Sequence, residues 1–434
     1  MNDNFDIGII GGGPAGYTYA LHASAQGKSV VLFEKDQIGG VCLNKGCIPT
    51  KSILHSSEVY KQTLNSENFG ITAQNVTLDY SKVIERKNKT VETLRKGIEL
   101  ALKNAKVNVI HGEAQIQDKN TISLKPSPKI QALDANLKPN FNPLPEVEGI
   151  YYCSKIVCST GSSPKIIKGL EFDHEFLLSS DDILNIASLP KSILIVGSGA
   201  IGVEWARIFN NFGVETTVVE LAQHLLPLAD TEVSKRLERI FKAEKIKFYT
   251  QTCVKEINNK KINLSNGETL EPDMVLVAVG RTPNITDKIE GVTYIGDVTG
   301  EIQLAHYAIK QAIEDIDGIK FKKELTPSVV YGTPEIAWVG KREQDLEPES
   351  YKKSLVLLSA IGKAHCDGQT DGFIKILSQN DKIVGAHIVS NEASSLIQQI
   401  NVAMQNGVTV DKLKEVCFPH PTYSEGIYDA LFKL

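Results

Sequence analysis

A glycine-rich turn that occurs twice is the feature that most constrains the fold of this chain. Each copy stands between an apolar stretch and a helix-like stretch, first in FDIGIIGGGPAGYTYALHASAQGKSVVLFEK and again in SILIVGSGAIGVEWARIFNNFGVETTVVE. A glutamate, Glu34 or Glu220, follows the last glycine of each copy after 18 positions, at the end of the next apolar stretch. The glycines of the two G-x-G-x-x-G patterns are Gly11, Gly13, Gly16, Gly197, Gly199 and Gly202.

The two copies predict two βαβ units, each built to bind a dinucleotide. A single G-x-G-x-x-G is weak evidence, but here a preceding strand, a following helix and a terminal acid complete the pattern twice. The glycines would permit the tight turn, the approach of a pyrophosphate and close helix packing, while Glu34 and Glu220 would accept hydrogen bonds from ribose hydroxyls. Since Glu220 is followed by LAQHLLP, which has no lysine or arginine, the second site favours NAD over NADP.

Length and composition predict a multidomain globular protein. The 434 residues exceed the size of one hydrophobic core, and a net charge of -5 with 42% hydrophobic residues is ordinary composition. The basic stretch 81–106 has apolar residues at helical spacing, so it predicts an amphipathic helix rather than a nucleic-acid surface. Apolar runs are shorter than the roughly 18 residues of a membrane span, and the N-terminus has no signal pattern, so we expect a cytoplasmic protein without a membrane partner.

Two of the seven cysteines, Cys42 and Cys47, lie close together in GGVCLNKGCIPTK, directly after the first βαβ unit. A zinc site needs about four ligands. The other pair at this spacing, Cys153 and Cys158, falls in a strand-like stretch, so no metal is expected. An odd number of scattered cysteines does not indicate a disulfide framework either. Near a flavin and a nicotinamide, a dithiol could relay electrons by disulfide exchange.

Further motifs extend over nearly the whole chain. They are GGGPAG with Glu34, the cysteine segment, TG at 160–161, GSGAIGVE, GRTPN (280–284), YIGDVTG (294–300), LAHYA (304–308), TPEIAWVG (333–340) and HPTYSE (420–425). With these motifs the chain resembles the flavin-dependent pyridine nucleotide-disulfide oxidoreductases, and within them the members that oxidise dihydrolipoyl groups. The cysteine segment and HPTYSE are the most specific parts of the resemblance.

The resemblance implies an α/β fold with two Rossmann-like dinucleotide-binding domains, one for FAD and one for NAD, and a C-terminal α+β dimerisation domain. Within the last domain, 371–389 predicts a hairpin and 391–407 a helix that ends at Gly407. The expected boundaries are 1–147 for the FAD domain with the cysteine pair, 148–280 for the NAD domain, 281–325 for the return to the FAD and central region, and 326–434 for the dimerisation domain.

The resemblance also implies a role for each cysteine. Cys47 would lie against the flavin as the charge-transfer thiol, and Cys42 would exchange with the substrate. Lys51, one helical turn after Cys47, would approach the flavin N5 and pair with Glu204 of the second βαβ unit.

A histidine would complete the active site. His420 would be the acid/base for the substrate thiols, and Glu425 would orient it. The residue type suits the task, because only a thiolate attacks a disulfide and the ordinary pKa of histidine, about 6.5, is close to neutrality.

The cofactors would be contacted by a larger set of residues, among which Asp297 would hold hydroxyls on the ribityl side of FAD. The expected contacts are Gly11, Gly13, Pro14, Ala15, Gly16, Glu34, Lys35, Gly40, Val41, Cys42, Lys51, Thr160, Gly161, Gly197, Gly199, Gly202, Glu220, Gly280, Arg281, Gly296, Asp297, Leu304, Ala305 and His306.

The implied activity is oxidation of protein-bound dihydrolipoyl groups with reduction of NAD, through tightly but non-covalently bound FAD and the Cys42–Cys47 disulfide. The partners would be a second copy of the chain, which shares the active site, and a lipoyl carrier of a 2-oxoacid dehydrogenase or glycine-cleavage system. One alternative is a glutathione-reductase-like enzyme, although such enzymes normally use NADP and show arginines after the second βαβ unit. The other is a non-catalytic FAD-binding scaffold.

Three stretches depart from the family pattern or carry no clear periodicity. Only 11 residues, 285–295, separate GRTPN from GD, so a loop and two strands of the central region are expected to be trimmed. Gly332 stands where the family commonly has threonine. The proline-rich stretch 123–149 predicts an irregular excursion.

Overall fold

The structure, a computed structural model, describes residues 3–125, 149–284 and 287–434. The chain forms two compact units, and each is described here by itself. Unit 1 comprises Met1–Ser52, Lys82–Lys165 and Arg281–Phe321, and unit 2 comprises Ile53–Ser81, Ile166–Gly280 and Lys322–Leu434. In the described part of the chain, no helix has the length and apolar character needed to cross a membrane.

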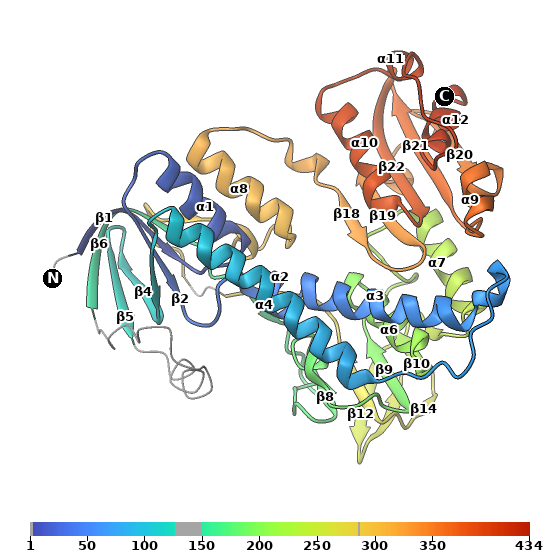
Figure 1. Ribbon diagram of the computed structural model, residues 1–434, viewed down its shortest axis with the longest axis horizontal. Coiled ribbons are helices and arrows are strands. Elements are labelled where there is room, and N and C mark those ends of the chain that lie inside the picture. Colours follow the sequence, from blue (N-terminus) through green and yellow to red (C-terminus); the bar gives the residue numbers. More distant parts are fainter. Residues whose placement is uncertain (1–2, 126–148, 285–286) are drawn as a thin grey trace. The chain divides into compact units, whose positions relative to one another are not determined.

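Unit 1 is built on a seven-stranded sheet (Figure 1). Its parallel part contains the strand-helix-strand unit that the first glycine pattern predicts. The strands, in the order β3-β2-β1-β6-β5-β4, are β3 (Asn108–His111), β2 (Val30–Glu34), β1 (Asp3–Ile10), β6 (Gly149–Cys158), β5 (Thr121–Lys125) and β4 (Glu113–Asp118), and β17 (Thr293–Tyr294) pairs with β6. A separate two-stranded sheet joins β7 (Ser162–Pro164) to β16 (Arg281–Pro283).

Helices α1 (Pro14–Ala25) and α8 (Ala305–Asp317) lie side by side in unit 1 (Figure 1). Their shared core with the sheet includes Ile9, Leu32 and Ala308. The longer helix α4 (Tyr80–Asn104) adds Leu102 to this core, in agreement with the amphipathic pattern expected at 81–106. Burying each such aliphatic side chain stabilises the fold by roughly 1.5–3 kcal/mol.

The boundary between the first two domains differs from the one expected at 147/148. Strand β6 pairs in parallel with β1, with Ile7 opposite Lys155, so it belongs to unit 1, and this unit continues to Lys165. The pairing joins segments more than 140 residues apart, which local sequence patterns do not reveal. Most of the excursion expected at 123–149 lies outside the described residues, and its flanks are the strands β5 and β6.

Unit 2 contains the second βαβ unit in a five-stranded parallel sheet. Helices α6 (Ala200–Asn211) and α7 (Thr231–Ala243) connect its strands. The strands, in the order β11-β10-β9-β15-β8, are β11 (Lys247–Tyr249), β10 (Glu215–Val219), β9 (Ser192–Val196), β15 (Met274–Val277) and β8 (Leu177–Leu178). A three-stranded sheet of β12 (Val254–Asn258), β13 (Lys261–Leu264) and β14 (Thr269–Leu270) follows α7 and β11 in the chain.

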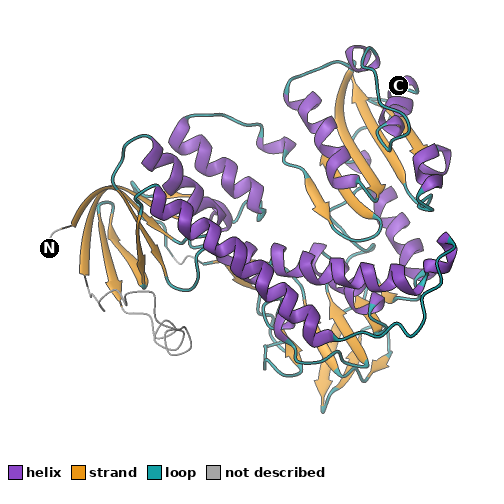
Figure 2. Ribbon diagram, in the orientation of Figure 1, coloured by secondary structure: helices purple, strands orange, loops and turns teal. Residues whose placement is uncertain are grey.

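The C-terminal part of unit 2 is an antiparallel sheet flanked by helices (Figure 2). The expected hairpin is confirmed, because β21 and β22 pair in antiparallel register from Phe373 opposite Val389 onward. The sheet order is β18 (Ser328–Val330), β19 (Glu335–Gly340), β22 (Lys382–Ser390), β21 (Phe373–Gln379) and β20 (Lys352–Leu357). The helices are α9 (Gly362–Cys366), α10 (Ala393–Gln405), α11 (Val410–Lys414) and α12 (Glu425–Phe432).

Candidate active site

The first glycine-rich loop has almost no room for side chains. Gly11 has φ +100°, and a Cβ at this position would lie 2.3 Å from the carbonyl oxygen of Ser159. A Cβ at Gly16 would lie 1.9 Å from the carbonyl oxygen of Gly11, so only glycine lets α1 start this close to β1. Helix α1 begins with Pro14 in its first turn, where proline's missing N–H costs no hydrogen bond. A side chain at Gly11 or Gly16 would therefore displace the turn or the helix.

Glu34 closes this loop from the end of β2. Its buried carboxylate accepts a hydrogen bond from the N–H of Gly12 at 2.7 Å and another from the N–H of Asp36 at 2.8 Å. The acid is therefore held at the tip of the loop, beside the N-terminus of α1. This is the position from which it can meet a ribose in the dinucleotide-binding unit.

The second glycine-rich loop repeats this geometry in unit 2. Gly197 has φ +99°, and a Cβ at Gly202 would lie 2.0 Å from the carbonyl oxygen of Gly197. Glu220 accepts hydrogen bonds from the N–H and the hydroxyl of Ser198, at 2.8 and 2.7 Å, and from the N–H of Ala222 at 2.8 Å. Both loops thus fit a dinucleotide, with a close backbone, a helix N-terminus and a fixed carboxylate.

The cysteine segment GGVCLNKGCIPTK (39–51), called the redox segment from here on, packs directly on the first loop. Helix α2 (Gly40–Lys45) begins at Gly40, where φ is +59° and a Cβ would lie 2.7 Å from the Cα of Gly13. Helix α3 (Cys47–Leu64) begins at the second cysteine. The short helix α2 and the start of α3 therefore place Cys42 and Cys47 close to the turn that is built for the first cofactor.

Cys42 and Cys47 contact each other through their thiols. The pKa of Cys42 is raised well above its usual value, first by a hydrogen bond with Cys47 and then by burial, while the charge of Lys51 acts in the opposite direction. Cys47 is exposed at the N-terminus of α3, where the helix dipole favours a thiolate. The pair is thus asymmetric, with one partly buried and one exposed cysteine. Among the described residues, no group of three histidine, cysteine or acidic side chains is placed to hold a metal ion.

Hydrogen bonds in unit 1 fix three of the expected cofactor residues. Ser162 Oγ donates to Asp297 at 2.7 Å, and Arg281 Nε donates to Ser162 Oγ at 2.8 Å. The amide of Asn284 donates to the carbonyl oxygen of Thr160 at 3.0 Å, which fixes the TG turn. Sequence reasoning missed Ser162, because a serine that follows TG carries no signal of its own.

His420 and Glu425 form a pair in unit 2. His420 Nδ1 and Glu425 Oε1 are 2.7 Å apart, and the N–H of Thr422 donates to Glu425 Oε2 at 2.9 Å. The hydrogen bond from His420 comes first among the causes that hold the pKa of Glu425 below its usual value. The histidine side chain is 77% exposed, so its other ring nitrogen is open to a substrate.

Comparisons with known proteins agree with this geometry. A model of the pyridine nucleotide-disulphide oxidoreductases matches residues 5–312, and a model of their dimerisation domain matches residues 326–431. The chain belongs to this family. Membership confirms the predicted fold class, the predicted FAD and NAD cofactors and an NAD-dependent oxidoreductase with a dimerisation domain.

Relatives in the family cover nearly the whole chain. Dihydrolipoyl dehydrogenase of Bacillus subtilis (strain 168) is 33% identical over 99% of this chain and 98% of its own length. Dihydrolipoyl dehydrogenase of Chlorobaculum parvum is 34% identical over 99% of this chain and 96% of its own length. Among solved structures, LpdA of Mycobacterium tuberculosis has the same fold, with a TM-score of 0.87, 22% identity and 99% of both chains covered.

Glu204, expected to pair with Lys51, lies in α6 of unit 2. Its side chain is 3% exposed, and it accepts a hydrogen bond from the N–H of Tyr331 at 3.1 Å. Lys51 belongs to unit 1, so the pairing of the two side chains stays a prediction. Other expected contact residues fall at turns or helix starts of their units: Lys35, Val41, Gly161, Gly280, Gly296, Leu304, Ala305 and His306.

The family departure at Gly332 has a physical explanation in unit 2. Gly332 has φ +146°, and a Cβ there would lie 2.4 Å from Nη1 of Arg207. Arg207 is 2% exposed in α6 and donates from Nη1 to the carbonyl oxygen of Pro334. The arginine occupies the space that a side chain at position 332 would need. For the other departure, residues 285–286 lie outside the described residues, and β17 is the strand that follows them.

Proposed function

We propose that this family member is a dihydrolipoyl dehydrogenase, which oxidises a protein-bound dihydrolipoyl group and reduces NAD to NADH. The observation that carries the proposal is the packing of the redox segment on the first glycine-rich loop. Gly40 leaves no space for a side chain against Gly13, and Cys42 follows two residues later. A dithiol is therefore built onto the turn where FAD would bind.

The chain's own residues would hold both cofactors. Glu34 and the loop from Gly11 to Gly16 suit the adenosine and pyrophosphate of FAD, and Asp297 suits hydroxyls of its ribityl chain. Glu220 and the second loop suit NAD, because a 2′-phosphate would meet the charge of this carboxylate. When bound, the flavin supplies two-electron chemistry that no side chain can provide.

Substrate oxidation uses residues of the chain itself. A substrate thiolate would attack Cys42 in the Cys42–Cys47 disulfide, which breaks the S–S bond and releases Cys47 as a thiolate. The second substrate thiolate would attack the mixed disulfide, which closes the lipoyl disulfide and releases Cys42. The two electrons then reside on the cysteine pair. Two protons leave the substrate.

His420 would accept these protons at Nε2 and release them to solvent. Its Nδ1 is hydrogen-bonded to Glu425, which leaves Nε2 free to face the substrate. Glu425 stays ionised, because its pKa lies below the usual value, and so it stabilises the imidazolium that forms. An exposed histidine without Glu425 would have neither a fixed ring orientation nor a neighbouring carboxylate charge.

The proposal extends to the assembly and to the cell. In the proposed homodimer, His420 of one subunit serves the disulfide of the other. The physiological partner would be a lipoyl carrier of a 2-oxoacid dehydrogenase or glycine-cleavage system. A cytoplasmic location would suit seven cysteines of which none is placed in a structural disulfide.

The first test is NAD reduction by dihydrolipoamide with the flavin-loaded protein. We expect NAD reduction, and Cys42→Ser should retain FAD while losing this turnover. Activity with NADPH and oxidised glutathione in place of NAD reduction would instead identify a glutathione-reductase-like enzyme.

The shared site can be tested with two inactive variants, Cys47→Ser and His420→Gln. Each heterodimer of the two chains would contain one site with both the cysteine and the histidine intact. We expect activity to return when the chains are refolded or expressed together. Heterodimers without any activity would contradict a site shared between subunits.

A further inference from the structure

The loop that follows Glu220 folds back onto the second glycine-rich turn. Ser198, between the first two glycines, donates from its N–H and its hydroxyl to Glu220. The N–H of Leu226 donates in turn to the carbonyl and the hydroxyl oxygen of Ser198, at 3.2 Å each. Leu226 is therefore the point where residues 221–229 fix the glycine-rich turn.

Leu226 holds this position in a strained conformation. Its φ is +53° and its side chain is 2% exposed, which is unusual for a bulky residue. Its carbonyl oxygen accepts hydrogen bonds from the N–H of Ala229 at 2.9 Å and from the hydroxyl of Ser234 at 3.3 Å. Such a conformation persists only where the surrounding structure holds it, so the next residues along the chain matter.

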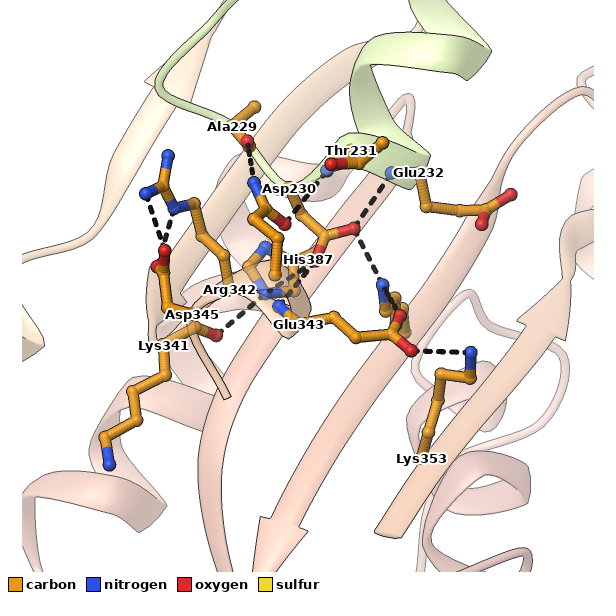
Figure 3. A network of polar contacts seen from close by, with 12 residues as sticks. Ala229, Asp230, Thr231, Glu232, Lys341, Arg342, Glu343, Asp345, Lys353 and His387 are labelled. Carbon is orange, nitrogen blue, oxygen red and sulfur yellow. Dashed lines mark hydrogen bonds and ion pairs between the residues drawn. The ribbon is translucent and has the colours of Figure 1, made fainter. Parts of the chain in front are cut away.

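Asp230, directly after this loop, anchors it in a buried ionic network (Figure 3). The side chain is completely buried. One carboxylate oxygen accepts a hydrogen bond from the N–H of Glu232, so that Asp230 caps the N-terminus of α7. The same oxygen accepts from Lys375 Nζ at 2.7 Å. The other accepts from the N–H of Glu343 at 2.9 Å and lies 3.8 Å from Nε2 of His387.

The rest of the network comes from the C-terminal part of unit 2. Lys375 on β21 is 1% exposed and contacts the Glu343 carboxylate at 2.5 Å as well as Asp230. Glu343 also accepts from Lys353 at 2.8 Å, as Figure 3 shows. The ammonium of Lys375 is therefore shared between two carboxylates. Removing it would leave the buried carboxylate of Asp230 without its ammonium partner.

A neutral side chain holds the same turn from both sides. Gln344 donates to the carbonyl oxygen of Ala229 at 3.0 Å and accepts from the N–H of Thr231 at 3.2 Å. These two residues flank Asp230 in the chain. The segment 229–231 is thus clamped by side chains of the dimerisation domain.

We infer that Asp230, Lys375 and Gln344 are positioning residues for NAD. They hold Leu226 in its strained conformation, and Leu226 holds Ser198 and with it the acceptor geometry of Glu220. The dimerisation domain thereby sets the affinity of the second dinucleotide site. The inference rests on the proposed function in one respect, that NAD occupies this loop.

The test compares three single variants in the flavin-loaded protein. Lys375→Met removes the ammonium that Asp230 and Glu343 share. Gln344→Ala removes the hydrogen bonds to Ala229 and Thr231 at an exposed residue and leaves the ion pairs intact. Asp371→Asn is the matched control. It removes the negative charge from the ion pair of Asp371 with Arg236, which also ties α7 to the dimerisation domain but does not touch residues 221–230.

The readouts are the NADH dissociation constant, measured by titration, and the steady-state constants with NAD and dihydrolipoamide. We expect Lys375→Met to raise the dissociation constant and the KM for NAD roughly tenfold, and Gln344→Ala to raise both by about threefold. The KM for dihydrolipoamide and the rate at saturating NAD should not change. Asp371→Asn should behave like wild type in all of these.

The outcomes separate this inference from the proposed function. If Gln344→Ala binds NADH as wild type does, or if all three variants only lower the melting temperature, the positioning role is wrong. Gln344→Ala decides the matter alone if Lys375→Met fails to fold. NADH binding by wild type without dihydrolipoamide turnover would overturn the proposed function while the binding comparison still tests the inference.

Discussion

The two glycine-rich loops of this chain have the same backbone but different neighbours. The first is closed by its own redox segment, since a Cβ at Gly40 would lie 2.7 Å from the Cα of Gly13. In the second, a Cβ at Gly199 would meet no described atom within 4 Å apart from its neighbours in the chain. One loop is packed against protein and the other faces open space, although their turns have nearly equal φ angles.

The difference suits two cofactors with different lifetimes on the protein. FAD stays bound through many turnovers, so a loop covered by the redox segment is an advantage. NAD must enter and NADH must leave in each turnover, so an open second loop is an advantage. The contacts of Leu226 and Asp230 hold this loop in place on the side away from the cofactor. Backbone packing defines the first loop, whereas a buried ionic network supports the second.

The largest expected effect comes from the third glycine of each loop. A Cβ at Gly16 or Gly202 would lie 1.9 or 2.0 Å from a carbonyl oxygen, so a helix must move in either alanine variant. We expect Gly16→Ala to lose its flavin and roughly 3 kcal/mol or more of stability, because α1 lies in the core of unit 1. Gly202→Ala should keep its flavin and lose NADH binding.

Flavin absorbance per polypeptide after gel filtration and NADH titration measure these two losses. Gly97→Ala serves as the control, since Gly97 lies within α4 and a Cβ there would meet no atom within 4 Å. Equal loss of flavin from Gly16→Ala and Gly202→Ala would contradict the assignment of FAD to the first loop and NAD to the second.

A smaller effect is expected at Gly199, the second glycine of the NAD loop, and at Gly40, which packs against the second glycine of the FAD loop. Gly40→Ala is strained by φ +59° and by contact with Gly13, so it should release flavin and lower stability by about 1–3 kcal/mol. Gly199→Ala should melt like wild type, but its methyl group should hinder the pyrophosphate and raise the KM for NAD about tenfold. Thermal melting and NAD kinetics distinguish the two. A Gly199→Ala variant with wild-type KM would show that NAD does not approach this glycine closely.

Local chemistry explains what could be predicted from the sequence. A positive φ at Gly11 or a carboxylate at the end of β2 follows from residues within one βαβ unit, so the motif contains the information. The pair His420 and Glu425 is also local, five positions apart in the chain. These features could be read without any knowledge of the remaining fold.

Contacts between distant segments could not be predicted in this way. Asp230 meets Lys375 across 145 positions, and Gly332 makes room for an arginine 125 positions earlier. Neither partner belongs to a motif, and a lysine within an apolar strand such as β21 would ordinarily be assigned to the solvent side. The pairing of strand β6 with β1 is of the same kind, since the two strands lie far apart in the chain.

The last expected effect is a loss of stability in mild acid, and it originates in the ionic network around Asp230. Burial lowers the pKa of His387 to about 4, against 6.5 in the unfolded chain. Burial of Glu343 raises its pKa, but hydrogen bonds from Lys353, Lys375 and Tyr351 outweigh this effect and lower the pKa to about 2. The unfolded chain therefore takes up a proton at position 387 as the pH falls through 6.5, before Glu343 contributes below 4.5.

Between pH 7 and pH 5, His387 alone should cost about 2 kcal/mol of unfolding free energy. Calorimetric melting at both pH values should show a smaller loss in His387→Gln than in wild type. An equal loss in His387→Gln would mean that the neutral buried imidazole does not limit this network.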